Sequence, residues 1–284
     1  MRLGRGRAWP EVVAALVAAM AFAFVHWSGR SAPATFVLVP PDPTTLRLVT
    51  WNVGQGVDRG ASGLMHDQVE SIVERIVELE AEVVLLQELS SMAQARRLAR
   101  RLRAATNDSW DHKSQRATNG RYLCALSTRS VLDVTSADES PALVAQIDVR
   151  PGETLWIANL HASAFDAAER NLEVGRAVDW LLAREGDPRV AGLFLFGDLN
   201  LDLDIGTRGD VFTDDRHADV ETYAYATRRF RDFGLHAGPT AEPDRRLDYC
   251  LGQTRYVVTQ AGPWREARLP GMDHHPLVVD LQTR

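Results

Sequence analysis

The sequence predicts an α/β (α+β) fold in which two mixed, mostly antiparallel β-sheets pack face to face with helices outside. Apolar runs of strand length recur about ten times, and roughly three or four segments with helical spacing lie among them. A Pro-Gly turn at 151–152 joins two strands directly, so hairpins occur beside helical crossovers. At 284 residues, 45% of them hydrophobic, the chain can bury one large core or two small ones. The element pattern, more than the length, favours a single domain.

The N-terminal segment has the features of an export signal. Residues 12–25 form an uncharged apolar run, arginines precede it, and small residues follow at 31–34. A signal peptide cleaved near Ala34 fits this pattern, and so does an uncleaved anchor spanning residues 9–27. Either way the rest of the chain is expected to be secreted or anchored to the outer face of the cytoplasmic membrane. The predicted parts are a signal peptide or anchor at 1–28, a Pro-rich linker at 29–45 and a domain at 46–284.

The first part of the domain alternates strand and helix. The strand at 46–53 is apolar at almost every position except Arg47, which indicates a strand covered on both faces. Apolar residues then recur at helical spacing from Asp67 to Leu79, and a strand follows over 82–87. A second helix is expected from Ser91 to about Ala104, with arginines outside its apolar face.

The second part of the domain is richer in strands. Asp166 and Glu169 have the spacing of a capping box, so a helix is expected to begin there and to end before Gly186. The strands expected before and after this helix are 122–128, 131–136, 143–149, 154–160, 190–196, 247–252, 255–260 and 276–282.

The charge of the chain limits how it can hold a polyanion. The net charge is -6, and removal of the first 34 residues, with their four arginines and one glutamate, leaves -9. An acidic body does not attract polyanions through bulk charge, so a phosphate-bearing substrate requires a local site or a bound cation.

Two cysteines, Cys124 and Cys250, lie far apart in predicted strands. Export would permit a disulfide between them. We interpret them as two buried thiols, because nothing in the sequence brings their Cα atoms within bonding range.

Several apolar strands end in a side chain that can bind a metal or a phosphate. Rigid strand ends hold such groups in place, and groups at one edge of a sheet can converge on a single cleft. Each residue alone is weak evidence, because Asn and Asp are ordinary turn residues and a lone His is more often structural. The set has eight members: Asn52, Glu88, His161, Asp198, Asn200, Asp248, Asp273 and His274.

The motifs that contain these residues are, in order, TWNVGQG, LLQE, NLHAS, FGDLN, RLDYCL and MDHHPL. Together they resemble the endonuclease/exonuclease/phosphatase superfamily over roughly residues 46–284. This superfamily includes pancreatic-type deoxyribonucleases, abasic-site endonucleases, neutral sphingomyelinases and inositol polyphosphate 5-phosphatases. The resemblance implies a four-layer sandwich and metal-dependent phosphoester hydrolysis.

The resemblance also implies a metal site. Asn52 and Glu88 would help to hold a divalent cation, with Glu88 the main anionic ligand and Asp273 part of the metal shell. Carboxylate and amide oxygens favour Mg²⁺ over softer metals, with Mn²⁺ or Ca²⁺ as alternatives. A Cys-rich Zn²⁺ site is not supported.

The remaining residues of the set would carry the chemistry. By resemblance, His161 would lie beside the scissile phosphate, and Asp198 with Asn200 would orient the nucleophile and bind a phosphate oxygen. His274 would be the general base or a phosphate-binding histidine. Asp248 would fix the tautomer of His274, since a histidine backed by a carboxylate can move protons near neutral pH.

Three features depart from the family pattern. Met272 replaces the usual Ser before Asp273, and Gly54 stands where abasic-site endonucleases carry an acid. Residues 119–121, Asn-Gly-Arg, stand where pancreatic-type deoxyribonucleases place a Glu that pairs with the first histidine. His275 falls at a variable position and is treated as a neighbour. Neither subgroup is therefore a close match.

The leading hypothesis for function is phosphodiester hydrolysis in DNA or RNA by a monomeric enzyme. The five arginines between Arg96 and Arg103 could contact phosphates, although such residues more often form a solvated helix face. The acidic stretch after residue 201 is likewise expected to be a solvated loop rather than a Ca²⁺ site. Alternatives are a phospholipid phosphodiesterase of the neutral sphingomyelinase type, with membrane attachment through residues 9–27, and an inactive binding module.

Overall fold

The computed structural model describes residues 36–54, 68–134, 140–203, 213–235 and 238–283. The predicted export segment lies outside them. The compact unit begins at Phe36. Phe36 and Leu38 pack against a cluster of buried apolar side chains. The end of the predicted linker is therefore part of this unit, because Phe36 and Leu38 are partly covered, although Val37 and Val39 are exposed. Among the residues described, we find no helix with the length and apolar character needed to cross a membrane.

The first sheet has six strands in the order β11-β12-β1-β2-β4-β3. Strands β1 and β2 are parallel, and the other neighbours are antiparallel. The bounds are β1 Thr45–Asn52, β2 Val83–Leu89, β3 Asp111–Arg116, β4 Tyr122–Ser127, β11 Val257–Pro263 and β12 Leu277–Gln282.

The second sheet also has six strands, in the order β5-β6-β7-β8-β10-β9. Here β7 and β8 form the parallel pair, so each sheet has one parallel pair at its centre. The bounds are β5 Val131–Val134, β6 Leu143–Arg150, β7 Glu153–His161, β8 Val190–Asp198, β9 Arg231–Asp232 and β10 Asp248–Thr254.

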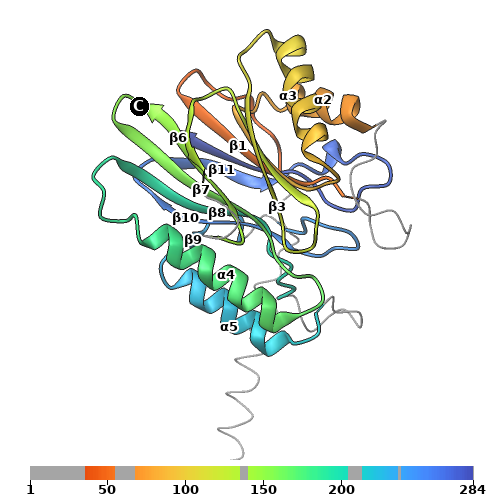
Figure 1. Ribbon diagram of the computed structural model, residues 1–284, viewed down its shortest axis with the longest axis vertical. Coiled ribbons are helices and arrows are strands. Elements are labelled where there is room, and N and C mark those ends of the chain that lie inside the picture. The colour runs from red at the N-terminus through yellow and green to blue at the C-terminus, as the bar shows by residue number, and fades with distance from the viewer. Residues whose placement is uncertain (1–35, 55–67, 135–139, 204–212, 236–237, 284) are drawn as a thin grey trace, which may run out of the picture. The chain divides into compact units, whose positions relative to one another are not determined.

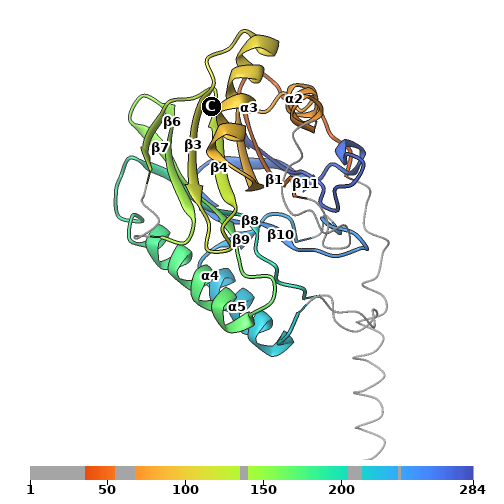
Figure 2. The ribbon, with the colours of Figure 1, turned by 45° about the vertical axis from the view of Figure 1, so that its right-hand side comes forward.

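Helices cover the outer faces of both sheets (Figures 1 and 2). The helices α2 (Val69–Glu78) and α3 (Met92–Thr106) pack on the first sheet, and α4 (Ala167–Leu182) and α5 (Arg216–Thr227) pack on the second. Between the sheets lies a third cluster of buried apolar side chains, to which both sheets contribute. The predicted four-layer sandwich of two mixed, mostly antiparallel sheets is confirmed.

Local sequence signals located most of these elements. The Ser91 hydroxyl accepts from Gln94 N, and Asp166 Oδ1 accepts from Glu169 N at 2.9 Å, so both residues cap their helices. The turn at Gly152, with a φ of 79°, joins β6 to β7 as the predicted antiparallel hairpin.

The burial of β1 and of the two cysteine thiols agrees with the predictions made from the sequence. Strand β1 is buried along almost its whole length, and the buried Arg47 guanidinium pairs with Asp280 at 2.8 Å and donates to Leu79 O, just after α2, at 2.7 Å. Cys124 and Cys250 are both free and buried, which confirms the interpretation as two thiols.

The acidic stretch after residue 201 differs from the expected solvated loop. Asp202 is fully buried, and Asp215 caps α5 by accepting from Ala218 N at 3.1 Å. Asp204 and Asp210 lie outside the described residues. Asp214 and Asp215 are exposed, so the expectation of solvated carboxylates fails at Asp202 and holds for these two residues.

Candidate active site

Five strand ends meet at one edge of the sandwich. In the first sheet, Asn52 ends β1 and Glu88 lies near the end of the parallel strand β2. In the second sheet, His161 and Asp198 end the parallel strands β7 and β8 and are in register. Asp248 begins β10 and lies opposite Asp198. The pairing pattern therefore brings predicted site residues from both sheets to one edge.

The Asn52 amide connects the two sheets at this edge. Asn52 Nδ2 donates to Glu88 Oε1 at 3.2 Å and to Asp198 Oδ2 at 2.9 Å. Asn52 Oδ1 accepts from Gly54 N at 2.9 Å, which sets the orientation of the amide. Asn52 thus holds two carboxylates together through its nitrogen, and its role as a metal ligand stays a prediction.

Glu88 reaches this position through an irregular stretch of β2. The register of β2 against β4 shifts between Leu86 and Leu89, and Glu88 has a φ of 63°. A Cβ added at Gly54 would lie 2.0 Å from Glu88 Oε2. Glu88 therefore occupies the space that a side chain at position 54 would need.

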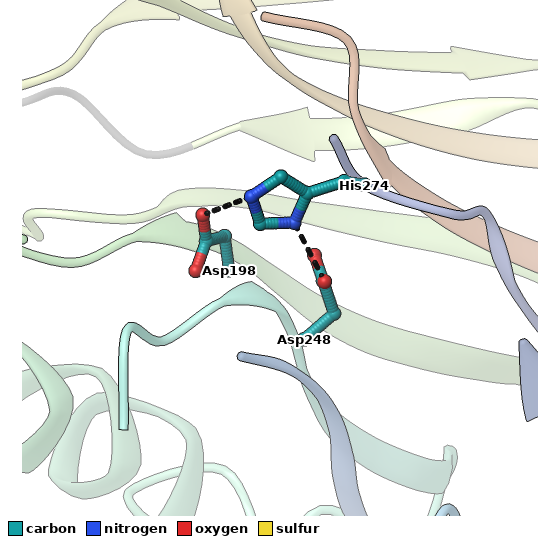
Figure 3. A group of neighbouring side chains, drawn as sticks. All are labelled: Asp198, Asp248 and His274. Carbon is teal, nitrogen blue, oxygen red and sulfur yellow. Dashed lines mark hydrogen bonds and ion pairs between the residues drawn. The ribbon is translucent and has the colours of Figure 1, made fainter. Parts of the chain in front are cut away.

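His274 and Asp248 form a buried hydrogen-bonded pair (Figure 3). His274 Nδ1 lies 2.8 Å from Asp248 Oδ2. The backbone on each side is fixed, because Trp51 Nε1 donates to His274 O at 3.2 Å and Asp248 N donates to Thr240 Oγ1 at 2.9 Å. The imidazole therefore presents Nε2 to the site, 3.5 Å from Asp198 Oδ2.

The surroundings of the adjacent residues His274 and His275 shift their pKa values in opposite directions. Burial by itself lowers the pKa of His274, but the carboxylates of Asp248 and Asp198 outweigh it and raise that pKa well above the usual value. Burial, with Arg268 close by, lowers the pKa of His275 to about 4. His274 is thus suited to carry a proton at neutral pH, whereas His275 is neutral.

His161 is oriented by a residue that the sequence did not single out. Asn119 Nδ2 lies 3.0 Å from His161 Nδ1, and Asn119 Oδ1 accepts from Arg121 N at 3.0 Å. The amide therefore donates to Nδ1 and leaves His161 Nε2 facing Glu88 Oε1 at 3.7 Å and Asp198 Oδ2 at 3.6 Å. The sequence did contain a signal for this residue. Asn119 belongs to the Asn-Gly-Arg turn at the position where pancreatic-type deoxyribonucleases have the Glu that pairs with the first histidine, and here Asn119 makes that contact.

Asn200 completes the support of Asp198. Asn200 N donates to Asp198 Oδ1 at 3.0 Å, and Asn200 Nδ2 donates to Ala162 O at 2.9 Å. Asn200 has a φ of 51°, a conformation that Asn adopts more readily than most residues. Its side chain is held by the segment after His161, so Asn200 positions the carboxylate and the end of β7 together.

Asp273 differs from the other seven predicted residues, because neither its side chain nor its backbone hydrogen-bonds to this group. Within the described ranges, its carboxylate has no recorded hydrogen bond or ion pair, while its backbone oxygen accepts from Glu242 N at 2.8 Å. Its charge contributes to the raised pKa of His274. A place for Asp273 in a metal shell stays a prediction.

The residues fit a hard divalent cation. Glu88 and Asp198 share one amide donor, and in the described part of the chain neither pairs with Lys or Arg. Ligand atoms of Asp198, Asp248 and His274 also lie within 4.8 Å of one another (Figure 3). Because His274 Nδ1 is already bonded to Asp248, the carboxylates of Glu88 and Asp198 are the better candidates for cation binding.

The chain has two stacked mixed sheets between pairs of helices, and carboxylates, amides and two histidines lie at one edge. This combination defines a phosphoesterase sandwich. The chain belongs to the Endonuclease/Exonuclease/phosphatase family, whose model matches residues 49–268. The resemblance seen in the motifs is thereby confirmed. Members of this family are phosphoesterase hydrolases, and this is the class of activity that the chain shares.

Solved structures show the same fold at low sequence identity. An endonuclease/exonuclease/phosphatase from Beutenbergia cavernae is 20% identical, with a TM-score of 0.60, over 84% of this chain and 72% of that one. A D. rerio TDP2 humanized by 14 mutations is 16% identical, with a TM-score of 0.60, over 84% and 100%. A Bacteroides thetaiotaomicron mannosyl-6-phosphatase is 15% identical, with a TM-score of 0.59, over 83% and 99%. No curated protein matches the chain.

Proposed function

We propose that the chain is an exported, metal-dependent phosphodiesterase that hydrolyses nucleic acid. One observation carries the catalytic part of this proposal. The Nε2 atoms of both histidines face the same oxygen, Asp198 Oδ2, at 3.6 Å for His161 and 3.5 Å for His274. A carboxylate flanked by two imidazoles can orient a water while the rings bind oxygens of the phosphoryl group under attack.

The hydrogen bonds support distinct roles for these groups. Asp198 is the acceptor that can orient the attacking water and take its proton. His274 is held at Nδ1 by Asp248, so its Nε2 is free to donate to a phosphoryl oxygen; the carboxylates of Asp248 and Asp198 raise the pKa of His274, which favours phosphate binding over the general-base role. His161, held at Nδ1 by Asn119, presents Nε2 to the phosphoryl group or to the leaving oxygen.

Glu88 is the residue that we assign as the main metal ligand, with Asp198 beside it. A bound Mg²⁺ would neutralise charge on phosphate oxygens at this point. Asn52 holds both carboxylates in place, so the cradle is set before a cation arrives.

Support for nucleic acid comes from helix α3. Arg97 and Arg101 pair with Glu70 of α2, at 3.4 and 2.7 Å, which leaves the exposed Arg96 and Arg100 without a recorded ion pair in the described ranges. Replacing both by Ala should raise the KM for DNA and weaken its salt dependence, while turnover of bis-p-nitrophenyl phosphate is unchanged. Equal effects on DNA and the small diester would contradict a nucleic-acid contact at α3.

Alternative substrates are tested in the same experiment. Plasmid nicking, phosphocholine release from sphingomyelin and phosphate release from mannose 6-phosphate are assayed with Mg²⁺ and then with EDTA, with Asp198→Asn as the inactive control. The sugar monoester is included because one structural neighbour is a mannosyl-6-phosphatase. EDTA-sensitive nicking supports the proposal. Activity on sphingomyelin alone, or on mannose 6-phosphate alone, would show that this compound and not nucleic acid represents the substrate class. Absence of activity on all three would favour an inactive binding module.

Export is proposed from the N-terminal sequence alone. Mass determination of the protein recovered from membrane and medium distinguishes a retained anchor at residues 9–27 from a signal cleaved near Ala34. Full-length protein confined to the cytoplasm would contradict export.

A further inference from the structure

The contact that orients His161 joins loops from two different sheets. Asn119 lies in the turn between β3 and β4 of the first sheet, whereas His161 ends β7 of the second. The turn is stable within itself, since Ala117 N donates to Arg121 O at 2.7 Å and Gly120 N donates to Ala117 O at 3.0 Å. These internal bonds set the shape of the turn but not its position relative to His161.

Glu173 links the two loops. This residue lies on α4, and its side chain is almost completely buried. Glu173 Oε1 accepts from Thr118 Oγ1 at 2.7 Å, next to Asn119 in the turn. Glu173 Oε2 accepts from Ser163 N at 2.7 Å, two residues after His161. One carboxylate thus holds both sides of the Asn119–His161 contact.

Burial of this carboxylate is unfavourable by itself. Burial raises the pKa of Glu173, and the hydrogen bonds from Thr118 and Ser163 offset part of that effect. The nearest buried arginine on α4, Arg170, instead pairs with Asp219 at 2.7 Å and donates to Ser163 O at 2.7 Å. Two buried charged side chains of α4 are therefore both used to hold the segment at Ser163.

We infer that Glu173 is a positioning residue, which sets the orientation of His161 by fixing the Thr118–Asn119 turn against the end of β7. This inference rests on the proposed function in assigning His161 to the reaction. Glu173 itself is separated from the reacting atoms by Asn119 and His161. Loss of its carboxylate should therefore affect the chemical step more than substrate binding.

The test compares three variants of the full chain. Glu173→Ala removes both acceptors and should lower kcat about 10- to 100-fold, with KM changed less than about threefold. Glu173→Gln should restore kcat to within about threefold of wild type, because an amide can accept from Ser163 N and donate to Thr118 Oγ1. Asn171→Ala is the matched control, since it removes a 2.7 Å bond from the same helix to Thr222 of α5. It should leave kcat unchanged.

A second background separates positioning from general destabilisation. In His161→Gln, the Glu173→Ala change should have little further effect on kcat, because the group that Glu173 positions is absent. An equal loss of kcat in both backgrounds, or a Glu173→Ala enzyme with wild-type kcat, would overturn the inference.

Amide hydrogen exchange without substrate gives a readout that is independent of activity. Glu173→Ala should speed exchange at Arg121 N and Ser163 N, and Asn171→Ala should not. If wild type hydrolyses none of the substrates, the proposed function fails while the exchange data still decide whether Glu173 holds the two loops. Unchanged exchange in Glu173→Ala would refute the link itself.

Discussion

At the scale of single residues, Gly54 and Glu88 compete for the same space. Gly54→Ala would place a Cβ 2.0 Å from Glu88 Oε2 and 2.9 Å from Glu88 Cβ, so rotation of the carboxylate alone would not relieve the contact. We expect kcat/KM to fall about 10- to 100-fold and the Mg²⁺ concentration for half-maximal activity to rise. Steady-state kinetics at varied Mg²⁺ measure both quantities.

Gly175→Ala provides the control for this glycine substitution. A Cβ at Gly175 of α4 meets nothing within 4 Å, so this change should stabilise the helix by about 0.5–1 kcal/mol and leave kinetics unchanged. Wild-type kinetics in Gly54→Ala would show that Glu88 is not fixed where the reaction needs it.

His274 and His275 offer a direct comparison of two neighbouring rings. His274→Ala should lower kcat by about 10²- to 10⁴-fold, because it removes the donor that Asp248 orients toward Asp198. His275→Ala removes a ring that faces Glu242 at 3.8 Å instead, and should keep most of the turnover per folded molecule. Single-turnover kinetics on both variants test this prediction, and equal losses would contradict the assignment of His274.

The sequence identified site residues by their place at strand ends but could not reveal how they are bonded. Six of the eight predicted side chains are connected around Asp198, and Asn200 holds that carboxylate from its backbone. Asn119 was missed because its partner, His161, is 42 residues away on another sheet. An Asn-Gly pair reads locally as an ordinary turn. The bond to His161 appears only when the sheets are packed.

At the scale of elements, a buried polar network ties the two sheets together beneath the site. Gln87 Nε2 donates to Asn159 Oδ1 at 2.6 Å and to Thr50 Oγ1 at 2.9 Å. Asn159 Nδ2 donates to Leu86 O and to Cys124 O, both at 3.1 Å. Leu86 O lies at the register shift in β2, so Asn159 satisfies a carbonyl in the stretch that positions Glu88.

Asn159→Ala should therefore lower both stability and activity. Two buried carbonyls would lose their side-chain donor, and the expected loss in free energy of unfolding is about 2–4 kcal/mol. The more exposed contact removed by Asn171→Ala should cost less, about 1 kcal/mol. Urea unfolding measures both values, and a loss in Asn159→Ala no larger than in the control would argue against the network.

Elements with strong local signals were predictable, and elements stabilised by their neighbours were not. Capping at Ser91 and Asp166 and the turn at Gly152 are local, so both helices and the hairpin were found. Strand β3 reads Asp-His-Lys-Ser-Gln-Arg, which has no apolar alternation, and exists because β4 pairs with it at the edge of the sheet. Helix α5 was hidden in an acidic stretch whose capping role at Asp215 becomes evident only with the helix in place.

At the scale of the whole molecule, the site exists only when the two sheets pack. Asn52 and Glu88 come from the first sheet, and Asp198 and Asp248 from the second. The sandwich therefore forces carboxylates together at one edge, and those of Asp248, Asp198 and Asp273 raise the pKa of His274. Repulsion between Glu88 and Asp198 is a cost of folding that a bound cation would remove.

Binding of a metal ion should consequently increase the thermal stability of the folded protein. Mg²⁺ at 100 times its Kd should add about 2.7 kcal/mol to the free energy of unfolding, seen as a higher Tm that EDTA reverses. Glu88→Gln should raise the Tm in EDTA, because one of the repelling charges is gone, and should lose the Mg²⁺-induced increase. Glu74→Gln, an exposed change on α2, should retain the full increase. Thermal unfolding in EDTA and in Mg²⁺ decides the matter: a full Mg²⁺ response in Glu88→Gln would place the cation elsewhere in the molecule.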